Sequence, residues 1–121
     1  MSECGLEKLP DSIGQLTNLQ ILYLYNNNLQ QLPASMGGLA NLTLLAIQNN
    51  KLSEFPQFIR QLHKLEILVI SGNKMAVEPE WVLGLKALKR LDMSKYQLQS
   101  EQQIQQLQKE CKQRGIDLGW Y

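Results

Sequence analysis

The sequence supplies none of the side-chain constellations that catalysis requires. His63 is the single histidine, and no second histidine or closely spaced cysteine pair accompanies it, so no metal site or catalytic histidine is predicted. Asp92 lacks a histidine or carboxylate partner for acid–base catalysis. Gly37-Gly38 lacks the lysine and hydroxyl residue of a phosphate-binding loop. The sequence therefore predicts no enzyme, no metal and no other cofactor.

Composition argues against two classes of partner. The 12 basic and 11 acidic residues give a formal net charge of +1, so no electrostatic attraction for nucleic acid or for an anionic membrane is predicted. No apolar run is long enough to cross a bilayer, and residues 1–6 lack the basic start and apolar stretch of a secretory signal. We therefore expect a soluble, cytoplasmic protein.

A repeat of 23 residues organises the sequence. The four prolines share one phase of this repeat, and leucines recur at the same spacing in three registers. The registers are Leu16, Leu39, Leu62 and Leu85; Leu19, Leu42, Leu65 and Leu88; and Leu22, Leu45, Leu68 and Leu91. A fixed spacing of like residues indicates stacked copies of one structural unit. We expect one domain over residues 1–121, with a partial repeat at 4–15, repeats at 16–38, 39–61, 62–84 and 85–99, and a C-terminal cap at 100–121.

The copies share a two-part pattern. The first part, LxxLxLxxNxL, is seen in residues 19–29, and the second part, LPxxIxxL, is seen in residues 9–16. The pattern resembles the leucine-rich repeat over about residues 4–100, in the 23-residue class found in intracellular Ras-pathway and polarity scaffolds and in bacterial repeat proteins. This resemblance implies an α/β right-handed solenoid with a parallel concave sheet, short convex helical turns and a non-enzymatic role in protein–protein interaction.

Elementary geometry leads to the same fold. Alternating leucines such as Leu22 and Leu24 point one face of a short strand inward. One unit cannot bury its own apolar side, so neighbouring strands must stack side by side. Asn27, Asn50 and Asn73 recur where the chain turns away from the sheet, and a buried amide can satisfy backbone groups there. The sequence thus predicts a structural asparagine ladder.

Two positions depart from the repeat. Glu78 occupies a slot that is apolar in the other copies, and we expect Val77 to fill that slot instead. Tyr96 replaces the ladder asparagine in the last copy, so the turn there should change its geometry.

Cysteine and aromatic side chains are interpreted as packing residues. Phe58 and Trp81 are 23 residues apart and should stack on the convex side. Cys4 stands at the ladder position and Cys111 on the apolar stripe of a helix, so both are expected in the core. Their predicted separation of about 20 Å is too long for a disulfide.

The two ends of the array are expected to differ. At the C-terminus, Ser100 is a suitable N-cap and Gln103 completes a capping box for a helix that Gly115 would end. Residues 116–120 then alternate in strand phase and predict a fifth strand, so helix and strand together form a cap. The first copy has no strand, which leaves residues 21–25 as an unpaired edge for another chain or another repeat to cover.

The residues between the inward leucines must face the concave side of the sheet. The first three strands then supply a contiguous apolar floor, and the fourth supplies a polar rim, a combination that favours binding of a protein or peptide. The predicted partner-binding residues are Ile21, Tyr23, Tyr25, Asn26, Leu44, Ala46, Gln48, Asn49, Ile67, Val69, Ser71, Arg90, Asp92, Ser94 and Lys95. Two alternatives remain: such side chains also simply suit strands, and the open edge and floor could join copies of this chain into a homo-oligomer.

Overall fold

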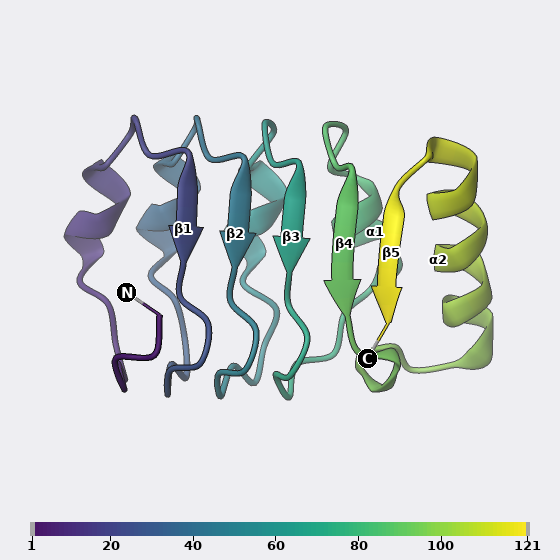
Figure 1. The fold of residues 1–121 in the computed structure, drawn as a ribbon, viewed down its shortest axis with the longest axis horizontal. Helices are drawn as coiled ribbons and strands as arrows, with labels where there is room; N and C mark the ends of the chain where they lie inside the picture. Colours follow the sequence, from purple (N-terminus) through teal and green to yellow (C-terminus); the bar gives the residue numbers. More distant parts are fainter. Residues whose placement is uncertain (1, 121) are drawn as a thin grey trace.

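Each copy of the repeat forms one short strand with a buried leucine at its centre. The strands are β1 (Ile21–Tyr23), β2 (Leu44–Ala46), β3 (Ile67–Val69), β4 (Arg90–Met93) and β5 (Asp117–Trp120). In the computed structural model, which describes residues 2–120, they form one parallel sheet in the order β1-β2-β3-β4-β5 (Figure 1). The register follows the 23-residue repeat, so Ile21 lies beside Leu44 and Leu44 lies beside Ile67. The predicted parallel sheet and its fifth strand are both confirmed.

Short helical turns form the convex side of the stack (Figure 1). Three are 3-10 turns, η1 (Asp11–Gln15), η2 (Ala34–Gly38) and η3 (Gln57–Gln61), and the fourth is the helix α1 (Pro79–Leu83). A proline directly precedes each 3-10 turn and begins α1. Proline has no backbone N–H to leave unpaired, and its fixed φ suits the start of a helical turn. The shared phase of the prolines thus places one turn behind each strand.

The core is a continuous column of leucines between the sheet and the convex turns. Leu39, Leu42 and Leu45 have no exposed surface, and their counterparts in the next coil, Leu62, Leu65 and Leu68, are equally buried to within 1%. A coil alone would leave this side open to water, so each coil is stabilised by the apolar area that its neighbours cover.

An asparagine ladder holds neighbouring coils together at the turn that follows each strand. Asn50 Nδ2 donates to the carbonyls of Leu24 at 2.9 Å and Ile47 at 3.1 Å, while its Oδ1 accepts from the N–H of Leu29 at 3.1 Å. Asn73 makes the equivalent bonds one coil further on, to the Ile47 carbonyl at 2.9 Å and from the Leu52 N–H at 3.2 Å. Each amide therefore satisfies backbone groups of its own coil and of the preceding coil.

The last ladder position is occupied by a glutamine, Gln97, which the 23-residue spacing does not predict. Gln97 Nε2 donates to the Ile70 carbonyl at 3.0 Å, and its Oε1 accepts from the N–H of Ser94 at 2.8 Å. The 3-10 turn η4 (Lys95–Gln97) brings this longer side chain into place. Tyr96 is therefore exposed, and the predicted change of turn geometry occurs here. Val77 is buried and Glu78 only half-buried, as the sequence predicted for the neighbouring departure from the repeat.

Two packing predictions are wrong. Trp81 stacks on Phe55, with ring centroids 5.1 Å apart and planes at 29°, rather than on Phe58, because Phe58 turns into the core. Cys4 is exposed, whereas Cys111 is buried as expected. Cys4 belongs to the first coil, so no earlier coil among residues 2–120 covers its side chain.

The C-terminal end of the stack is closed by the helix α2 (Glu101–Arg114) and by β5 (Figure 1). Ser100 Oγ accepts from the N–H of Gln103 at 3.2 Å, and Gly115 ends the helix with a left-handed φ of 71°. Leu107 and Cys111 are buried against the last repeat. Arg114 donates to the carbonyls of Leu83 at 2.6 Å and Leu85 at 2.8 Å, which ties the end of α2 to the convex side.

Candidate functional site

The concave surface of the sheet carries a row of apolar side chains in register. Ile21 and Tyr23 on β1 are 49% and 46% exposed, and Leu44, Ile67 and Val69 on the next two strands are half-buried. The rings of Tyr23 and Tyr25 meet edge to face, with centroids 6.0 Å apart, which orders this end of the surface. We call these contiguous residues the apolar floor: Ile21, Tyr23, Tyr25, Leu44, Ile67 and Val69.

Ala46 lies in the middle of the floor but is only 3% exposed, so the expectation that it contacts a partner directly needs correction. It lies between Tyr23 and Val69 in the strand register, and both of these side chains are larger. Alanine is too short to reach past them, which makes its position a dip in the floor rather than a contact.

The polar rim is more buried than the sequence suggested. Ser71, Asp92 and Ser94 are all buried, so they lie beneath the concave surface and not on it. Lys95 is exposed and Arg90 is half-exposed. Asp92 lies over Gly119, where an added Cβ would be 2.2 Å from its Oδ1, and Ser94 Oγ accepts from the N–H of Gly72 at 3.3 Å. Lys95 instead lies over the ring of Trp120, with Nζ 5.7 Å from the ring centroid.

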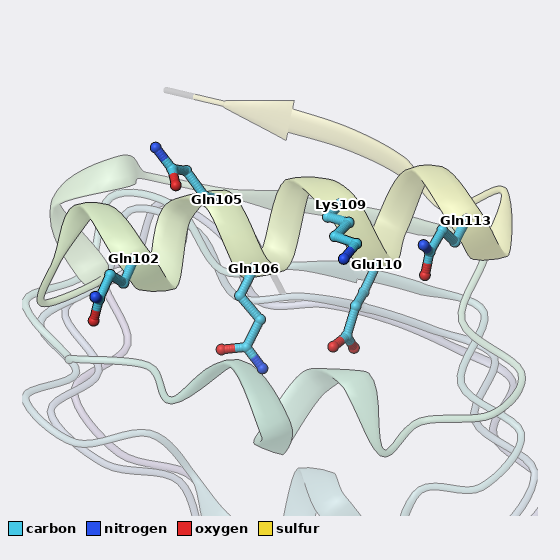
Figure 2. A pocket seen from close by; sticks show the side chains of 6 residues that line it. All are labelled: Gln102, Gln105, Gln106, Lys109, Glu110 and Gln113. Atoms are coloured by element: carbon cyan, nitrogen blue, oxygen red, sulfur yellow. The ribbon is translucent and has the colours of Figure 1, made fainter.

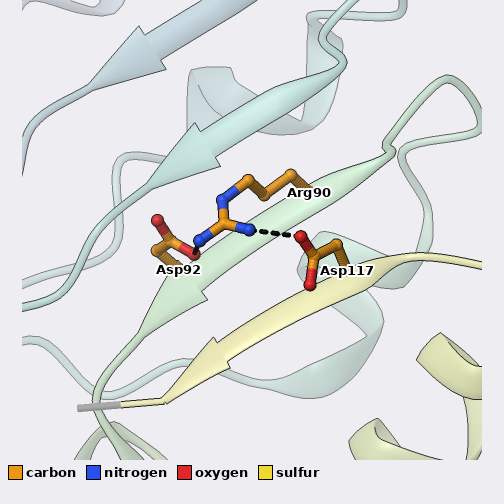
Figure 3. Close-up of polar contacts among 3 residues, drawn as sticks. All are labelled: Arg90, Asp92 and Asp117. Atoms are coloured by element: carbon orange, nitrogen blue, oxygen red, sulfur yellow. Dashed lines mark hydrogen bonds and ion pairs between the residues drawn. The ribbon is translucent and has the colours of Figure 1, made fainter.

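Arg90 is held between two carboxylates. Its guanidinium lies 2.9 Å from Asp92 Oδ1 and also forms an ion pair with Asp117 on β5 (Figure 3). Asp92, and after it Asp117, raises the pKa of Arg90 above its usual value. Asp117 was not among the predicted site residues, because its neighbourhood depends on the pairing of β4 with β5 across the intervening cap helix. This end of the concave surface is therefore internally paired.

A depression of about 490 Å³ lies beside the floor, towards the carboxyl ends of the strands. We call it the polar depression; its lining residues are Gln48, Asn49, Val69, Ser71, Gly72, Asp92, Ser94 and Tyr96. Gln48 Oε1 is buried and accepts no hydrogen bond from the described residues. The polar groups that a ligand would meet in the depression are therefore the other lining side chains, such as Asn49 and Ser71.

The edge of the polar depression contains a second chain of hydrogen bonds. Asn26 and Asn49 adopt left-handed φ values of 57° and 58°. Asn49 Nδ2 donates to Asn26 Oδ1 at 2.9 Å, and Asn26 Nδ2 donates to Glu3 Oε1 at 3.1 Å. These predicted contact residues are exposed, yet their amides already bind one another. The signal was present in the sequence, because asparagine tolerates this conformation and the same phase carries Gly72.

Charge divides the molecule into two parts. Residues 12–50 contain no charged side chain, and they include β1, β2, η2 and most of η1. Arg90, Asp92, Lys95 and Asp117 all lie at the other end of the sheet. The concave surface thus passes from a neutral, apolar half to a half with paired charges.

The outer face of α2 offers a different kind of surface. Its side chains line a shallow open depression, and Figure 2 shows them projecting outward from the helix: Gln102, Gln105, Gln106, Lys109, Glu110 and Gln113. The apolar residues Leu107 and Cys111 of the same helix point the other way, into the core. Without an apolar anchor, this face fits the solvated exterior of a cap.

Within residues 2–120, no group of three or more histidine, cysteine, aspartate or glutamate side chains is arranged to hold a metal ion. His63 is exposed. No helix in the same part of the chain has the length and apolar character needed to span a bilayer.

A solenoid of 23-residue coils with an asparagine ladder and a parallel concave sheet is the architecture of leucine-rich repeat proteins. The model of the leucine-rich repeat region family matches residues 1–111, so this chain belongs to that family. A solved leucine-rich repeat protein of Leptospira interrogans is 31% identical in sequence and superposes with a TM-score of 0.78. That match covers 93% of this chain and 28% of the Leptospira chain, so this chain spans little more than a quarter of its length. A comparison with curated protein sequences gives no match.

Domains of this family and fold generally mediate protein–protein interactions. They are typically non-enzymatic.

Proposed function

We propose that this domain is a non-enzymatic recognition module that binds a protein or peptide on its concave surface. The observation that carries the proposal is the apolar floor, where Ile21, Leu44 and Ile67 form one row in register across three strands. Contiguous exposed apolar surface on a folded domain commonly marks a site of interaction.

The floor supplies the apolar part of the binding energy. Ile21 and Tyr23 are about half exposed, and each would lose that surface against a partner. Complete burial of a side chain of this size is worth roughly 1.5–3 kcal/mol, so a few such contacts suffice for a specific complex.

The polar depression beside the floor gives orientation. A partner that covers Ile67 and Val69 would also lie over the polar depression, which is lined by Gln48, Ser71 and other neutral polar residues. An apolar side chain followed by a neutral hydrogen-bond donor is thus the partner chemistry that this surface fits. The paired charges around Arg90 would favour partners without a strong charge of their own.

The test is selection of peptides from a displayed library on the immobilised protein, followed by affinity measurement on matched variants. Ile67→Glu places a charge on the floor and should weaken binding by at least about ten-fold. Gln57→Glu introduces the same charge on an exposed position of the convex turn η3 and should leave affinity unchanged.

Selected peptides that bind Ile67→Glu as tightly as the wild type, with both variants folded by circular dichroism, would refute concave-surface recognition. Loss of binding in Gln57→Glu alone would move the site to the convex side.

Self-assembly through the same floor is the second candidate. It is favoured by the absence of charge in residues 12–50, because two copies could bury this half against each other without charge repulsion. Sedimentation velocity separates the two functions. A monomer over a wide range of concentration would remove self-assembly, whereas a dimer disrupted by Ile67→Glu would support it.

We further propose that the domain works in the cytoplasm. The support is that both cysteines, exposed Cys4 and buried Cys111, are free thiols, as is usual in a reducing compartment. Cell fractionation tests this location.

A further inference from the structure

Asn26, Asn49 and Gly72 occupy the same position of three successive coils, a few residues after each strand. All three have a left-handed backbone, with φ values of 57°, 58° and 73°. Asparagine and glycine adopt this conformation more readily than other residues. The backbone thus accounts for the choice between these two residue types, but it gives no reason for glycine in the third coil.

The exposed amides at this position form a column that runs in one direction and stops at Asn49. Asn26 Nδ2 donates to Glu3 Oε1 at 3.1 Å, and Asn49 Nδ2 donates to Asn26 Oδ1 at 2.9 Å. Each donor therefore lies one coil later in the sequence than its acceptor. Gly72 has no side chain to supply the next donor, and Asn49 Oδ1 accepts no hydrogen bond from residues 2–120. The column ends in an unused acceptor.

This acceptor lies at the wall of the polar depression. A Cβ atom added to Gly72 would be 2.0 Å from Asn49 Oδ1, so the oxygen lies where a side chain at position 72 would begin. Asn49 and Gly72 both line the depression, and Asn49 is exposed. The glycine thus leaves the Asn49 oxygen beside an open space of about 490 Å³ instead of covering it.

The other walls of the depression combine apolar surface with a charge that is already paired. Val69 lines one part, and the 67% exposed Tyr96 lines another, with its hydroxyl donating to the Asn73 carbonyl at 3.3 Å. The lining carboxylate of Asp92 is neutralised by Arg90, 2.9 Å away. An anion would meet the Asn49 oxygen and Asp92, and an ammonium group would lose water without gaining a free carboxylate. The depression therefore favours a neutral hydrogen-bond donor.

We propose that the polar depression is a subsite for a primary carboxamide, the side chain of an asparagine or glutamine of the bound partner. The proposal rests on the proposed recognition of a protein or peptide by the concave surface and names a group that the partner carries. One amide hydrogen of the partner donates to Asn49 Oδ1 and so continues the column with the bond that Asn49 makes to Asn26. The apolar stem of the side chain packs between Val69 and Tyr96.

A carboxamide suits this subsite better than a lone hydroxyl or N–H group, because it carries two donor hydrogens and an acceptor oxygen. The hydroxyl of Ser71, which lines the same depression, is a donor for that oxygen. Val69 also belongs to the apolar floor, next to Ile67. The partner residue beside the carboxamide is therefore apolar and lies on the floor.

Parallel selections from a displayed library of random linear peptides, on the wild type and on Gly72→Asn, test this subsite. The substitution supplies the carboxamide from within the chain, and the Asn26–Asn49 pair shows that two asparagines fit in successive coils here. The wild type should select peptides that contain asparagine or glutamine beside an apolar residue. Gly72→Asn should select the apolar residue without this preference.

Affinities of one selected peptide then isolate the hydrogen bond. Replacement of its carboxamide by the matching acid should weaken binding to the wild type about ten-fold, and replacement by leucine about five-fold. The leucine replacement should have no effect on binding to Asn49→Gly, which removes the acceptor and keeps a residue suited to positive φ. Asn18→Gly, which removes an exposed amide before β1, is the matched control and should keep the wild-type preference.

Selected peptides that lose affinity for Ile67→Glu but contain no preferred asparagine or glutamine would overturn the carboxamide subsite and leave concave-surface recognition intact. A preference for lysine at that place would also overturn the subsite, because Asp92 would then be the group recognised. An unchanged carboxamide preference in folded Asn49→Gly would do the same. If the folded wild type selects no peptide at all, the proposed function fails together with its subsite.

Discussion

The two ends of this solenoid handle the same structural problem differently. At the C-terminal end, α2 buries Leu107 and Cys111, β5 covers β4, and Arg114 binds two carbonyls of the convex side. At the N-terminal end, η1 is in place but β1 remains an edge, and Leu16, Ile21 and Tyr23 are exposed. The first end is closed by α2 and β5, whereas among residues 2–120 nothing pairs with the outer edge of β1.

The difference indicates which end of the sheet would bury more apolar surface on binding a partner. A solenoid is stabilised mainly by contacts between neighbouring coils, so a coil with a neighbour on one side only is stabilised less. Within residues 2–120, the neutral half around β1 therefore keeps apolar side chains such as Ile21 and Tyr23 exposed. The cap has already used its equivalent groups internally.

The largest expected difference between the ends concerns a single register of leucines. Leu39→Ala should destabilise the domain by about 2–5 kcal/mol, because it opens a cavity in a fully buried layer. Leu16→Ala removes a side chain that is 54% exposed and should cost under about 1 kcal/mol. Urea unfolding measures both. Equal costs would show that another surface covers Leu16 in solution.

The asparagine ladder should give the next largest effect. Asn50→Ala leaves the N–H of Leu29 and the carbonyl of Ile47 without their side-chain partner in a buried turn, at a cost of roughly 2–3 kcal/mol. Asn49→Ala is the neighbouring control; it removes an exposed amide and should cost well under about 1 kcal/mol apart from the preference for a positive φ. A similar cost for both variants would contradict a structural role specific to the ladder.

The cap should respond to the loss of its anchoring arginine. Arg114→Ala removes two charge-assisted hydrogen bonds to backbone carbonyls and should destabilise the cap by roughly 1–2 kcal/mol. Hydrogen exchange should speed up in α2 and β5 and remain unchanged in β1 and β2. Faster exchange across the whole sheet would mean that the array unfolds as one unit. Lys112→Ala, an exposed neighbour on the same helix, is the control.

The smallest effect concerns the thiols. Burial raises the pKa of Cys111 above its usual value, so the folded protein keeps this thiol protonated while the unfolded chain ionises. Its contribution to stability is present below the unfolded thiol pKa of about 8.5 and decreases as the pH rises above it. Stability of the wild type should therefore fall more between pH 8 and 10 than that of Cys111→Ala. A thiol reagent should modify Cys4 rapidly and Cys111 only after unfolding; equal rates would contradict the burial of Cys111.

The fold could be predicted almost completely from the sequence, because one period determines strand, turn and ladder together. Side-chain contacts that depend on the length of a neighbouring side chain could not be predicted. Gln97 reaches the ladder because of one additional methylene, and Trp81 meets Phe55 because Phe58 turns inward. The 23-residue spacing alone does not determine which of these side-chain contacts forms.

The site was predicted in its positions but less well in its exposure. Alternation places Ala46, Ser71 and Asp92 on the concave side, yet all three are buried: Ala46 is shorter than Tyr23 and Val69 beside it, and Asp92 pairs with Arg90 over Gly119. The pairing of Arg90 with Asp117 also depends on the last strand pair. The absence of charge from residues 12–50 was readable from the sequence and is the feature that best divides the surface.

Amide chemical-shift mapping tests the central claim most directly. A library-selected peptide would be titrated into the ¹⁵N-labelled protein, and the shifts would be compared along the sheet. Recognition on the apolar floor predicts changes concentrated on β1, β2 and β3, around Ile21, Leu44 and Ile67, with α2 and η3 unchanged. Changes concentrated on α2 or on the convex turns would contradict it.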